Sequence, residues 1–187
     1  LVPGFVGVGD GVEAGAQSGM TGGQRGFVPG ANCYEGARGL FGASAKHVVV
    51  PSARALAVDV EMGDEAILLS LAATAQHAIA GSPDAGSTQI VGHGVVGRLL
   101  ARLLMARGER PPTGWEISGA RERGASGYDV IRPEADPTTG YDTIIDASGD
   151  PAILDTLIGR INRGGEVILA GFYATPLSIA YPPAFMR

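Results

Sequence analysis

The residues best suited to chemistry are the glycines of Gly92-His93-Gly94-Val95-Val96-Gly97, with Glu116 about 20 residues further on. The glycine run follows the apolar stretch Gln89-Ile90-Val91 and opens the apolar helical pattern of 99–104. This order of strand, glycine turn and helix is the context in which G-x-G-x-x-G indicates a dinucleotide. The first glycine allows a tight turn, the second lets the backbone approach a pyrophosphate, and the third lets helix and strand pack closely.

A bound phosphate would lie on free N–H groups at the helix start, where the helix dipole favours an anion. Glu116 is expected to accept hydrogen bonds from ribose hydroxyls, which favours NAD and repels the 2′-phosphate of NADP. His93 lies inside the turn, closer to the expected pyrophosphate than to a substrate, and an exposed side chain at the turn is the alternative. The cofactor residues expected from the motif are Gly92, His93, Gly94, Val95, Val96, Gly97 and Glu116.

Other interpretations of this region stay open. The chain holds 30 glycines in 187 residues, so an ordinary glycine turn is one of them. Methyltransferases that bind S-adenosylmethionine also combine a glycine turn with an acid on the next strand, although their glycines usually run G-x-G-x-G. Arg121 and Arg123 could attract a 2′-phosphate, but we interpret them as a solvated helix face because Glu116 occupies the discriminating position.

The composition favours an enzyme over a nucleic-acid or membrane protein. Hydrophobic residues form 45% of the chain, enough for a core, and the net charge is −5 without a basic run. No stretch approaches the roughly 20 apolar residues that span a bilayer, and no signal peptide is visible, so we expect a cytoplasmic protein. The one cysteine, Cys33, excludes an internal disulfide and a multi-cysteine zinc lobe.

The residue pattern changes along the chain and predicts two domains, 1–58 and 59–187. The first domain has short β-type runs at Phe5–Val8, Phe27-Val28 and His47–Val50, separated by turn residues as in a small β-domain.

The second domain opens with a helical pattern over 65–80 for which Asp64 stands in the N-cap position. Strands are then expected at 89–91, before Glu116, and at 128–131, 143–146 and 167–170. A helix over 151–161 carries a proline near its start and is expected to end at Gly164-Gly165. This alternation predicts a parallel α/β sheet with right-handed crossovers. Because the chain starts without methionine and stops just after a strand, we interpret it as a fragment cut at both ends.

A β-domain followed by a helix and a nucleotide-binding α/β domain resembles the medium-chain dehydrogenase/reductase superfamily. The resemblance implies an α/β chain with a partial GroES-like β-domain, a partial Rossmann doubly wound parallel sheet, and a homodimer at full length. Short-chain dehydrogenases are disfavoured because their Tyr-x-x-x-Lys pair is absent. The matching segments are 1–15, 22–28, 66–77, 146–149 and 164–167.

Within the superfamily, the sequence is most similar to a branch that acts on a tetrapyrrole. That resemblance implies NAD-dependent oxidation of the 3-(1-hydroxyethyl) group of a bacteriochlorophyllide to 3-acetyl, in bacteriochlorophyll synthesis. It also implies that Thr74 packs at the nicotinamide, and that Ser148 and Gly171 edge the cofactor at strand ends. The similar segments are 27–33, 38–42, 90–99, 170–173 and 182–187.

Zinc alcohol dehydrogenases of the superfamily bind a metal through two cysteines and the histidine of a P-G-H-E segment. By resemblance, Phe5 stands at the histidine position and Ser70 at the second cysteine position, so we expect no metal. A developing alkoxide then needs a hydrogen-bonding partner and a base, for which His77 and Tyr173 are the candidates. Packing at the edge of the core is the alternative for His77.

Two other functions remain as alternatives. One is a zinc-free quinone or enoyl reductase of the same superfamily. The other is a nucleotide-binding protein without catalysis. Cys33 and Tyr34 lie in a loop that could border a substrate.

Overall fold

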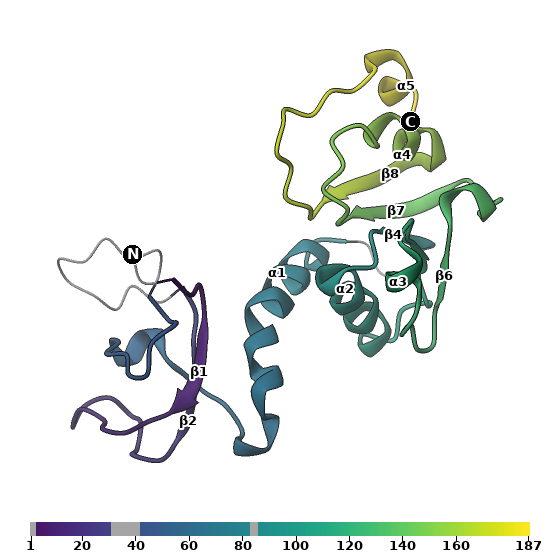
Figure 1. Ribbon diagram of the computed structural model, residues 1–187. Coiled ribbons are helices and arrows are strands. Elements are labelled where there is room, and N and C mark those ends of the chain that lie inside the picture. Colours follow the sequence, from purple (N-terminus) through teal and green to yellow (C-terminus); the bar gives the residue numbers. More distant parts are fainter. Residues whose placement is uncertain (1–2, 31–41, 83–85) are drawn as a thin grey trace. The chain divides into compact units, whose positions relative to one another are not determined.

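The computed structural model describes residues 3–30, 42–82 and 86–187 (Figure 1). It divides into two compact units, Leu1–Ser70 and Leu71–Arg187. Cys33 and Tyr34 lie outside the described residues. The domain limits 1–58 and 59–187 remain a prediction.

The first unit is built on a three-stranded antiparallel sheet in the order β1-β2-β3. β1 (Gly7–Asp10) pairs with β2 (Arg25–Val28), which pairs with β3 (Leu56–Ala57). A short 3-10 helix, Ser52–Arg54, precedes β3, and two more, Val60–Met62 and Asp64–Leu68, follow it.

Arg25 on the central strand β2 contacts the start of the 3-10 helix Asp64–Leu68. Its guanidinium donates to the carbonyl of Gly63 at 3.1 Å and lies 3.2 Å from a carboxylate oxygen of Asp10 and 3.4 Å from one of Asp64.

Two expectations for this unit are wrong. His47–Val50 is not a strand, and Val49 is 85% exposed. Residues with high β-propensity therefore did not suffice to form a strand there. The expected helix from Glu65 begins instead as the 3-10 helix Asp64–Leu68. Gly63, with a φ of 47°, takes the N-cap position, and the Asp64 side chain contacts Arg25 rather than capping.

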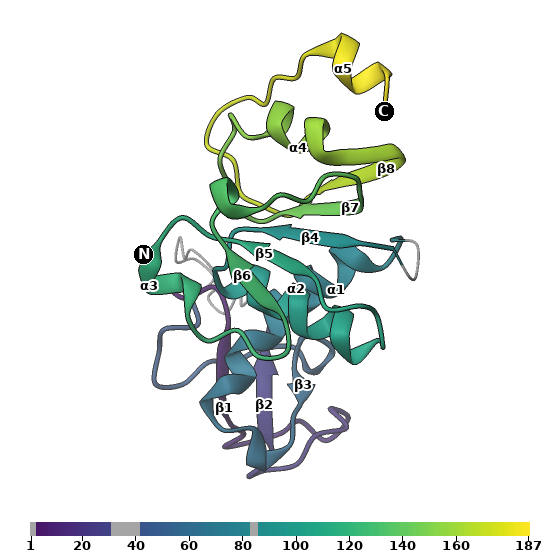
Figure 2. The same cartoon turned by 90° about the vertical axis from the view of Figure 1, so that its right-hand side faces the viewer.

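The second unit holds a five-stranded parallel sheet in the order β6-β5-β4-β7-β8 (Figure 2). Because β4 is the first of these strands in the chain and lies centrally, the strand order reverses between β4 and β7, as in a doubly wound sheet. The strands are β4 (Thr88–Val91), β5 (Thr113–Trp115), β6 (Asp129–Ile131), β7 (Tyr141–Asp146) and β8 (Ile161–Leu169). The helices are α1 (Leu69–Ile79), α2 (Val95–Ala106), α3 (Gly119–Glu122), α4 (Leu154–Arg160) and α5 (Tyr181–Phe185), with a 3-10 turn at Pro133–Ala135.

Both faces of this sheet are covered. Successive side chains of a strand point to opposite faces, so Ile90 packs with α1 and α2, whereas Val91 packs on the side of α4. Ile145 and Ile144 divide between the faces in the same way. Figure 2 shows α1 and α2 on one side of the sheet and α4 on the other. This double burial explains why the central strands read as continuous apolar runs.

The end of α4 also differs from expectation. Gly164-Gly165 do not terminate that helix; α4 ends at Arg160, and the glycine pair lies inside β8. The strand register shifts there, because Tyr141 pairs with Ile161 whereas Thr143 pairs with Glu166. Gly164 accommodates this irregularity with a φ of 76°. Pro151 precedes the helix rather than opening it.

A buried carboxylate, Asp136, joins several strands beneath the α4 face. Its Oδ2 accepts hydrogen bonds from the Trp115 indole at 2.8 Å, the Tyr141 hydroxyl at 3.0 Å and the Gln89 amide at 3.2 Å. Arg160 lies 3.6 Å from the same oxygen and stacks over the Trp115 ring. Burial alone would raise the pKa of Asp136, but its hydrogen bonds, first the Thr138 N–H and then Trp115 and Tyr141, lower it below the ordinary value.

None of the described helices is long and apolar enough to cross a membrane.

The charge of Asp136 should contribute to stability in a pH-dependent way. We expect Asp136→Asn to lower the unfolding free energy by about 2–4 kcal/mol at neutral pH, since its donors then face a neutral amide. The folded pKa lies below the unfolded value of about 4. The contribution of the carboxylate is therefore full above that value and is lost as the pH falls through the folded pKa.

Denaturant unfolding followed by the fluorescence of Trp115, the one tryptophan, measures this effect. The difference between wild type and Asp136→Asn should be constant from about pH 7 to 5 and shrink below about pH 4. The exposed Asp129→Asn is the control. A difference that persists undiminished in acid would contradict the assignment.

Candidate functional site

The three glycines of the turn after β4 meet three different requirements. Gly92 has a φ of 91°, and a Cβ there would lie 2.9 Å from the Cα of Ser148. A Cβ on Gly97 would strike the carbonyl of Gly92, so α2 can approach β4 only with glycine at this position. Both requirements come from the fold itself.

Gly94 differs from the other two because nothing in the described chain requires it. Its φ of −77° is available to any residue, and a Cβ would meet no atom within 4 Å. Gly94 is the residue before α2, whose first backbone N–H groups, at Val95, Val96 and Gly97, have no acceptor within a helix. A bare backbone beside unpaired N–H donors is suited to the close approach of an anionic ligand.

This turn borders a cavity of about 170 Å³ at the carboxyl ends of β4, β5 and β7. Ligands of open α/β sheets bind at this edge, next to the strand-order reversal. The lining combines backbone of the turn, one ion pair and apolar side chains. The lining residues are Val91, Gly92, Gly94, Trp115, Glu116, Ile117, Arg121, Pro133, Ala147, Ser148, Asp150 and Ile153.

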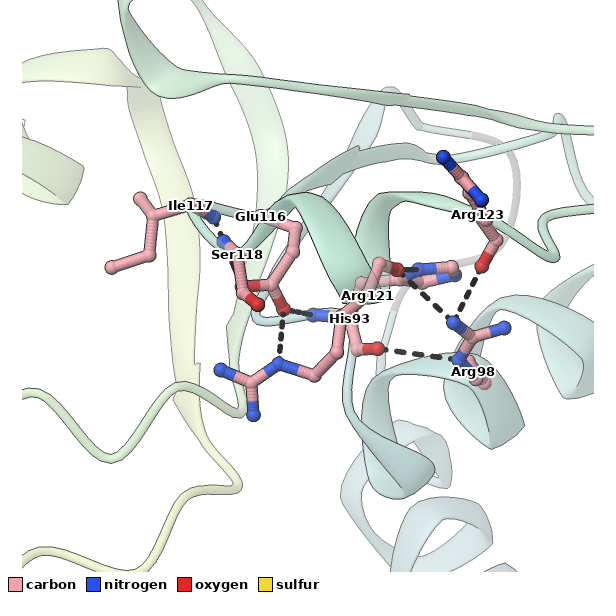
Figure 3. Close-up of polar contacts among 7 residues, drawn as sticks. All are labelled: His93, Arg98, Glu116, Ile117, Ser118, Arg121 and Arg123. Carbon is pink, nitrogen blue, oxygen red and sulfur yellow. Dashed lines mark hydrogen bonds and ion pairs between the residues drawn. The ribbon is translucent and has the colours of Figure 1, made fainter.

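Glu116 follows β5, and its carboxylate is only 4% exposed (Figure 3). One oxygen, Oε1, accepts from the N–H of Ile117 at 3.0 Å and of Ser118 at 2.8 Å. The other, Oε2, accepts from the N–H of His93 at 3.0 Å and lies 3.3 Å from Nε of Arg121. Glu116 thus binds the glycine turn to the end of β5.

These contacts keep the carboxylate ionised. Burial acts to raise the pKa of Glu116, but the N–H groups of Ser118 and His93 and the charge of Arg121 outweigh it and lower the pKa. The site therefore presents a fixed negative charge at the end of β5.

The side chain of His93 is buried, so the alternative of an exposed ring at the turn is wrong. Its Nδ1 lies 2.6 Å from the carbonyl oxygen of Arg121, and its Nε2 lies 2.6 Å from the hydroxyl of Tyr128. The ring does not line the cavity, and its backbone N–H is taken by Glu116. The structure therefore gives the His93 ring structural contacts rather than a place beside a phosphate.

Arg121 lies in the helix α3 with an exposed side chain, as expected, but it also contacts the site. Its guanidinium pairs with Glu116 and lines the cavity, while about three-fifths of the side chain stays exposed. The short α3 turns this side chain back toward β5, which spacing along the chain does not reveal.

Two curated proteins are similar to the whole chain. The 2-desacetyl-2-hydroxyethyl bacteriochlorophyllide A dehydrogenase of Rhodobacter capsulatus is 50% identical over 188 residues, which is 100% of this chain and 60% of that protein. The protein of the same name from Cereibacter sphaeroides is 48% identical over 192 residues, again 100% of this chain and 60% of its length. The chain thus spans less than two thirds of the relatives it matches. No protein-family model matches the chain.

Solved structures of dehydrogenases share the fold. The 2R,3R-butanediol dehydrogenase of Bacillus subtilis is 21% identical, with a TM-score of 0.76 over 94% of this chain and 60% of that one. The chain thus has the fold of these dehydrogenases. A partial GroES-like β-domain and a partial Rossmann sheet, as expected from the sequence, describe its α/β fold.

Two further structures of this fold contain a nicotinamide cofactor. A dehydrogenase of Sinorhizobium meliloti bound to NADP is 19% identical, with a TM-score of 0.76 over 95% of this chain and 64% of that one. An alcohol dehydrogenase of Escherichia coli in complex with NADH is 17% identical, with a TM-score of 0.75 over 95% and 63%. Both forms of the cofactor therefore occur on this fold.

The other site residues expected from the sequence lie after two strands and on α1. Ser148 follows β7 and lines the cavity, and its N–H donates to the buried Asp146 at 2.9 Å. Gly171 follows β8, where a Cβ would lie 2.9 Å from the N of Gly149. Thr74 and His77 lie on the exposed side of α1, opposite the buried Ala75 and Ile79.

Tyr173 is bound to Asp146 and not directed into the cavity. Its hydroxyl donates to Oδ2 of Asp146 at 2.7 Å, and burial together with this carboxylate raises the pKa of Tyr173 far above its ordinary value. A hydroxyl held in this way is a poor proton acceptor at neutral pH.

Among residues 3–30, 42–82 and 86–187, no three His, Cys, Asp or Glu side chains gather as a metal site would require.

Two alanine substitutions in the glycine turn should separate the needs of the fold from those of a ligand. We expect Gly97→Ala to lower the unfolding free energy by about 2 kcal/mol, because its Cβ displaces α2 from the Gly92 carbonyl. Gly94→Ala should cost less than about 1 kcal/mol, the loss of a better N-cap.

Denaturant unfolding followed through Trp115 measures both variants. Equal losses for Gly94→Ala and Gly97→Ala would mean that Gly94 also serves packing, and that the open space around it has no functional meaning.

Proposed function

We propose that this chain is part of a dehydrogenase that oxidises the 3-(1-hydroxyethyl) group of a bacteriochlorophyllide to an acetyl group, with NAD as hydride acceptor. The observation that carries the nucleotide site is the bare backbone at Gly94, beside the cavity and the ionised Glu116. The substrate is inferred from the shared name of the two relatives, at 50% and 48% identity.

The residues of the cavity suit the parts of a dinucleotide. The N–H groups of Val95 and Val96 would bind the pyrophosphate, with Gly94 leaving space for it. Ile117 and Ile153 supply apolar surface for the adenine, and Glu116 accepts from the ribose hydroxyls. When bound, the nicotinamide would take the hydride of the carbinol carbon.

The contacts of Glu116 suggest how a ribose would enter. A carboxylate has about four lone-pair sites, and here three N–H groups and Arg121 use them. The three N–H groups belong to the backbone and are fixed by the fold, whereas the Arg121 side chain is mostly exposed. We infer that the ribose displaces the Arg121 guanidinium from Oε2, and that Arg121 then contacts the ligand.

The negative charge at Glu116 also supports NAD over NADP. A lowered pKa keeps the carboxylate charged at physiological pH, opposite the position of a 2′-phosphate. We propose His77 as the candidate for moving the proton. A homodimer, a cytoplasmic location and the lack of a bound metal remain proposals for the full-length protein.

The proposed activity can be tested with the full-length protein, 3-(1-hydroxyethyl)bacteriochlorophyllide a and NAD. NADH formation and the shift of the pigment absorption band to that of the acetyl product should rise together, in equal molar amounts. NADH binding without turnover would favour a non-catalytic nucleotide-binding protein. Turnover only with a quinone and NADPH would favour the reductase alternative.

Gly94→Ala should weaken cofactor binding without unfolding the protein. Its Cβ would occupy the space left for the pyrophosphate, so we expect the Kd for NADH to rise at least about tenfold, as the loss of about 1.4 kcal/mol would do. Energy transfer from Trp115, which lines the cavity, to NADH measures the Kd. The matched control is Gly81→Ala, outside the cavity and also with open space at its Cβ. An unchanged Kd in Gly94→Ala would remove the main support for this site.

A further inference from the structure

Two side chains outside the cavity determine where Arg121 stands. The His93 ring is 2% exposed, and its Nδ1 lies 2.6 Å from the carbonyl oxygen of Arg121 in α3 (Figure 3). Arg98 of α2 reaches the same oxygen, with Nη2 at 3.0 Å. One backbone carbonyl is therefore held by two donors from the glycine turn and its helix.

The chemistry of these contacts selects the tautomer of His93. A carbonyl oxygen can only accept, so Nδ1 carries the hydrogen and donates to Arg121. Nε2 of the neutral ring then accepts from the hydroxyl of Tyr128 at 2.6 Å. The contact with Arg121 and the contact with Tyr128 thus use opposite sides of the ring and can be removed separately.

Arg98 extends the connection along the α3 segment. Its Nη2 also donates to the carbonyl of Arg123 at 2.6 Å, and its Nε donates to the carbonyl of His93 at 3.3 Å. The α3 segment is short, with only four helical residues, and its Ser118 N-cap makes no side-chain hydrogen bond. Its position therefore depends on contacts with other elements.

We propose that His93 and Arg98 are positioning residues of the adenosine end of the cofactor site. They hold the backbone of Arg121 at the cavity, so that its guanidinium can leave Oε2 of Glu116 and contact the ribose that replaces it. This inference rests on the proposed nucleotide site and extends it to residues that do not line the cavity.

Three substitutions distinguish this role from general stability. His93→Leu removes both ring contacts, whereas Tyr128→Phe removes only the contact at Nε2. His93→Asn places an amide N–H at the same number of bonds from the backbone as Nδ1, so it can still donate to Arg121. If positioning of Arg121 is what matters, His93→Asn should restore what His93→Leu loses, and Tyr128→Phe should resemble wild type.

The measurement is the Kd of the full-length protein for ADP-ribose, which contains the adenosine end without the nicotinamide. We expect His93→Leu to raise this Kd about tenfold, the effect of losing one buried hydrogen bond. His93→Asn and Tyr128→Phe should stay within about threefold of wild type. With NAD as substrate, His93→Leu should raise KM by a similar factor and leave kcat within about twofold, a separation that partial unfolding would not produce.

Arg98→Met provides a second test should His93→Leu fail to fold, and it too should raise the Kd for ADP-ribose about tenfold. Unchanged binding in both variants, or an equal loss in Tyr128→Phe, would overturn the positioning role. If the wild-type protein binds NADH and ADP-ribose but the variants bind equally well, only this inference fails. If wild type binds neither, the proposed nucleotide site fails as well.

Discussion

The buried carboxylate of Glu116 is the contact on which the site depends. The carboxylate accepts hydrogen bonds from backbone N–H groups of two loops. His93 belongs to the glycine turn after β4, and Ile117 and Ser118 follow β5. Two loops that leave neighbouring parallel strands are thereby brought to one charged group. Because burial of a carboxylate is costly unless hydrogen bonds compensate, the arrangement requires all of these donors.

A second constraint is that the sheet supporting these loops is buried on both faces. Ile90 and Val91, adjacent in β4, belong to two different core clusters, and Ile145 and Ile144 of β7 repeat the pattern. Each central strand therefore needs helices on both sides, which the connections through α2 and α4 provide. The same connections direct the ends of β4, β5 and β7 toward one edge, where the cavity lies. Packing of the core and placement of the site are thus consequences of one topology.

The three glycines of the turn also show that one motif can combine separate physical demands. Gly92 is required by the backbone conformation of the turn, and Gly97 is required by the close contact between helix and strand. Neither demand applies to Gly94, so the glycine at this position is better explained by the approach of a ligand. All three lie within one turn, so that the fold and the proposed anion site are formed by the same six residues.

The sequence by itself determined the alternation of strands and helices in the second unit, the parallel sheet and the glycine turn. These features depend on local patterns: apolar runs for buried strands, helical spacing in 99–104, and glycines at fixed offsets. The predictions from the sequence were wrong where the local structure depends on a pairing partner far along the chain. His47–Val50 has strand-forming residues but no strand, and Gly164-Gly165 became an irregularity within β8 because β7 lies alongside. Only the tertiary structure decided that the His93 ring turns away from the cavity and that Arg121 turns into it. Their partners, Tyr128 and Glu116, lie on neighbouring strands or just beyond them, and only the folded sheet brings them together.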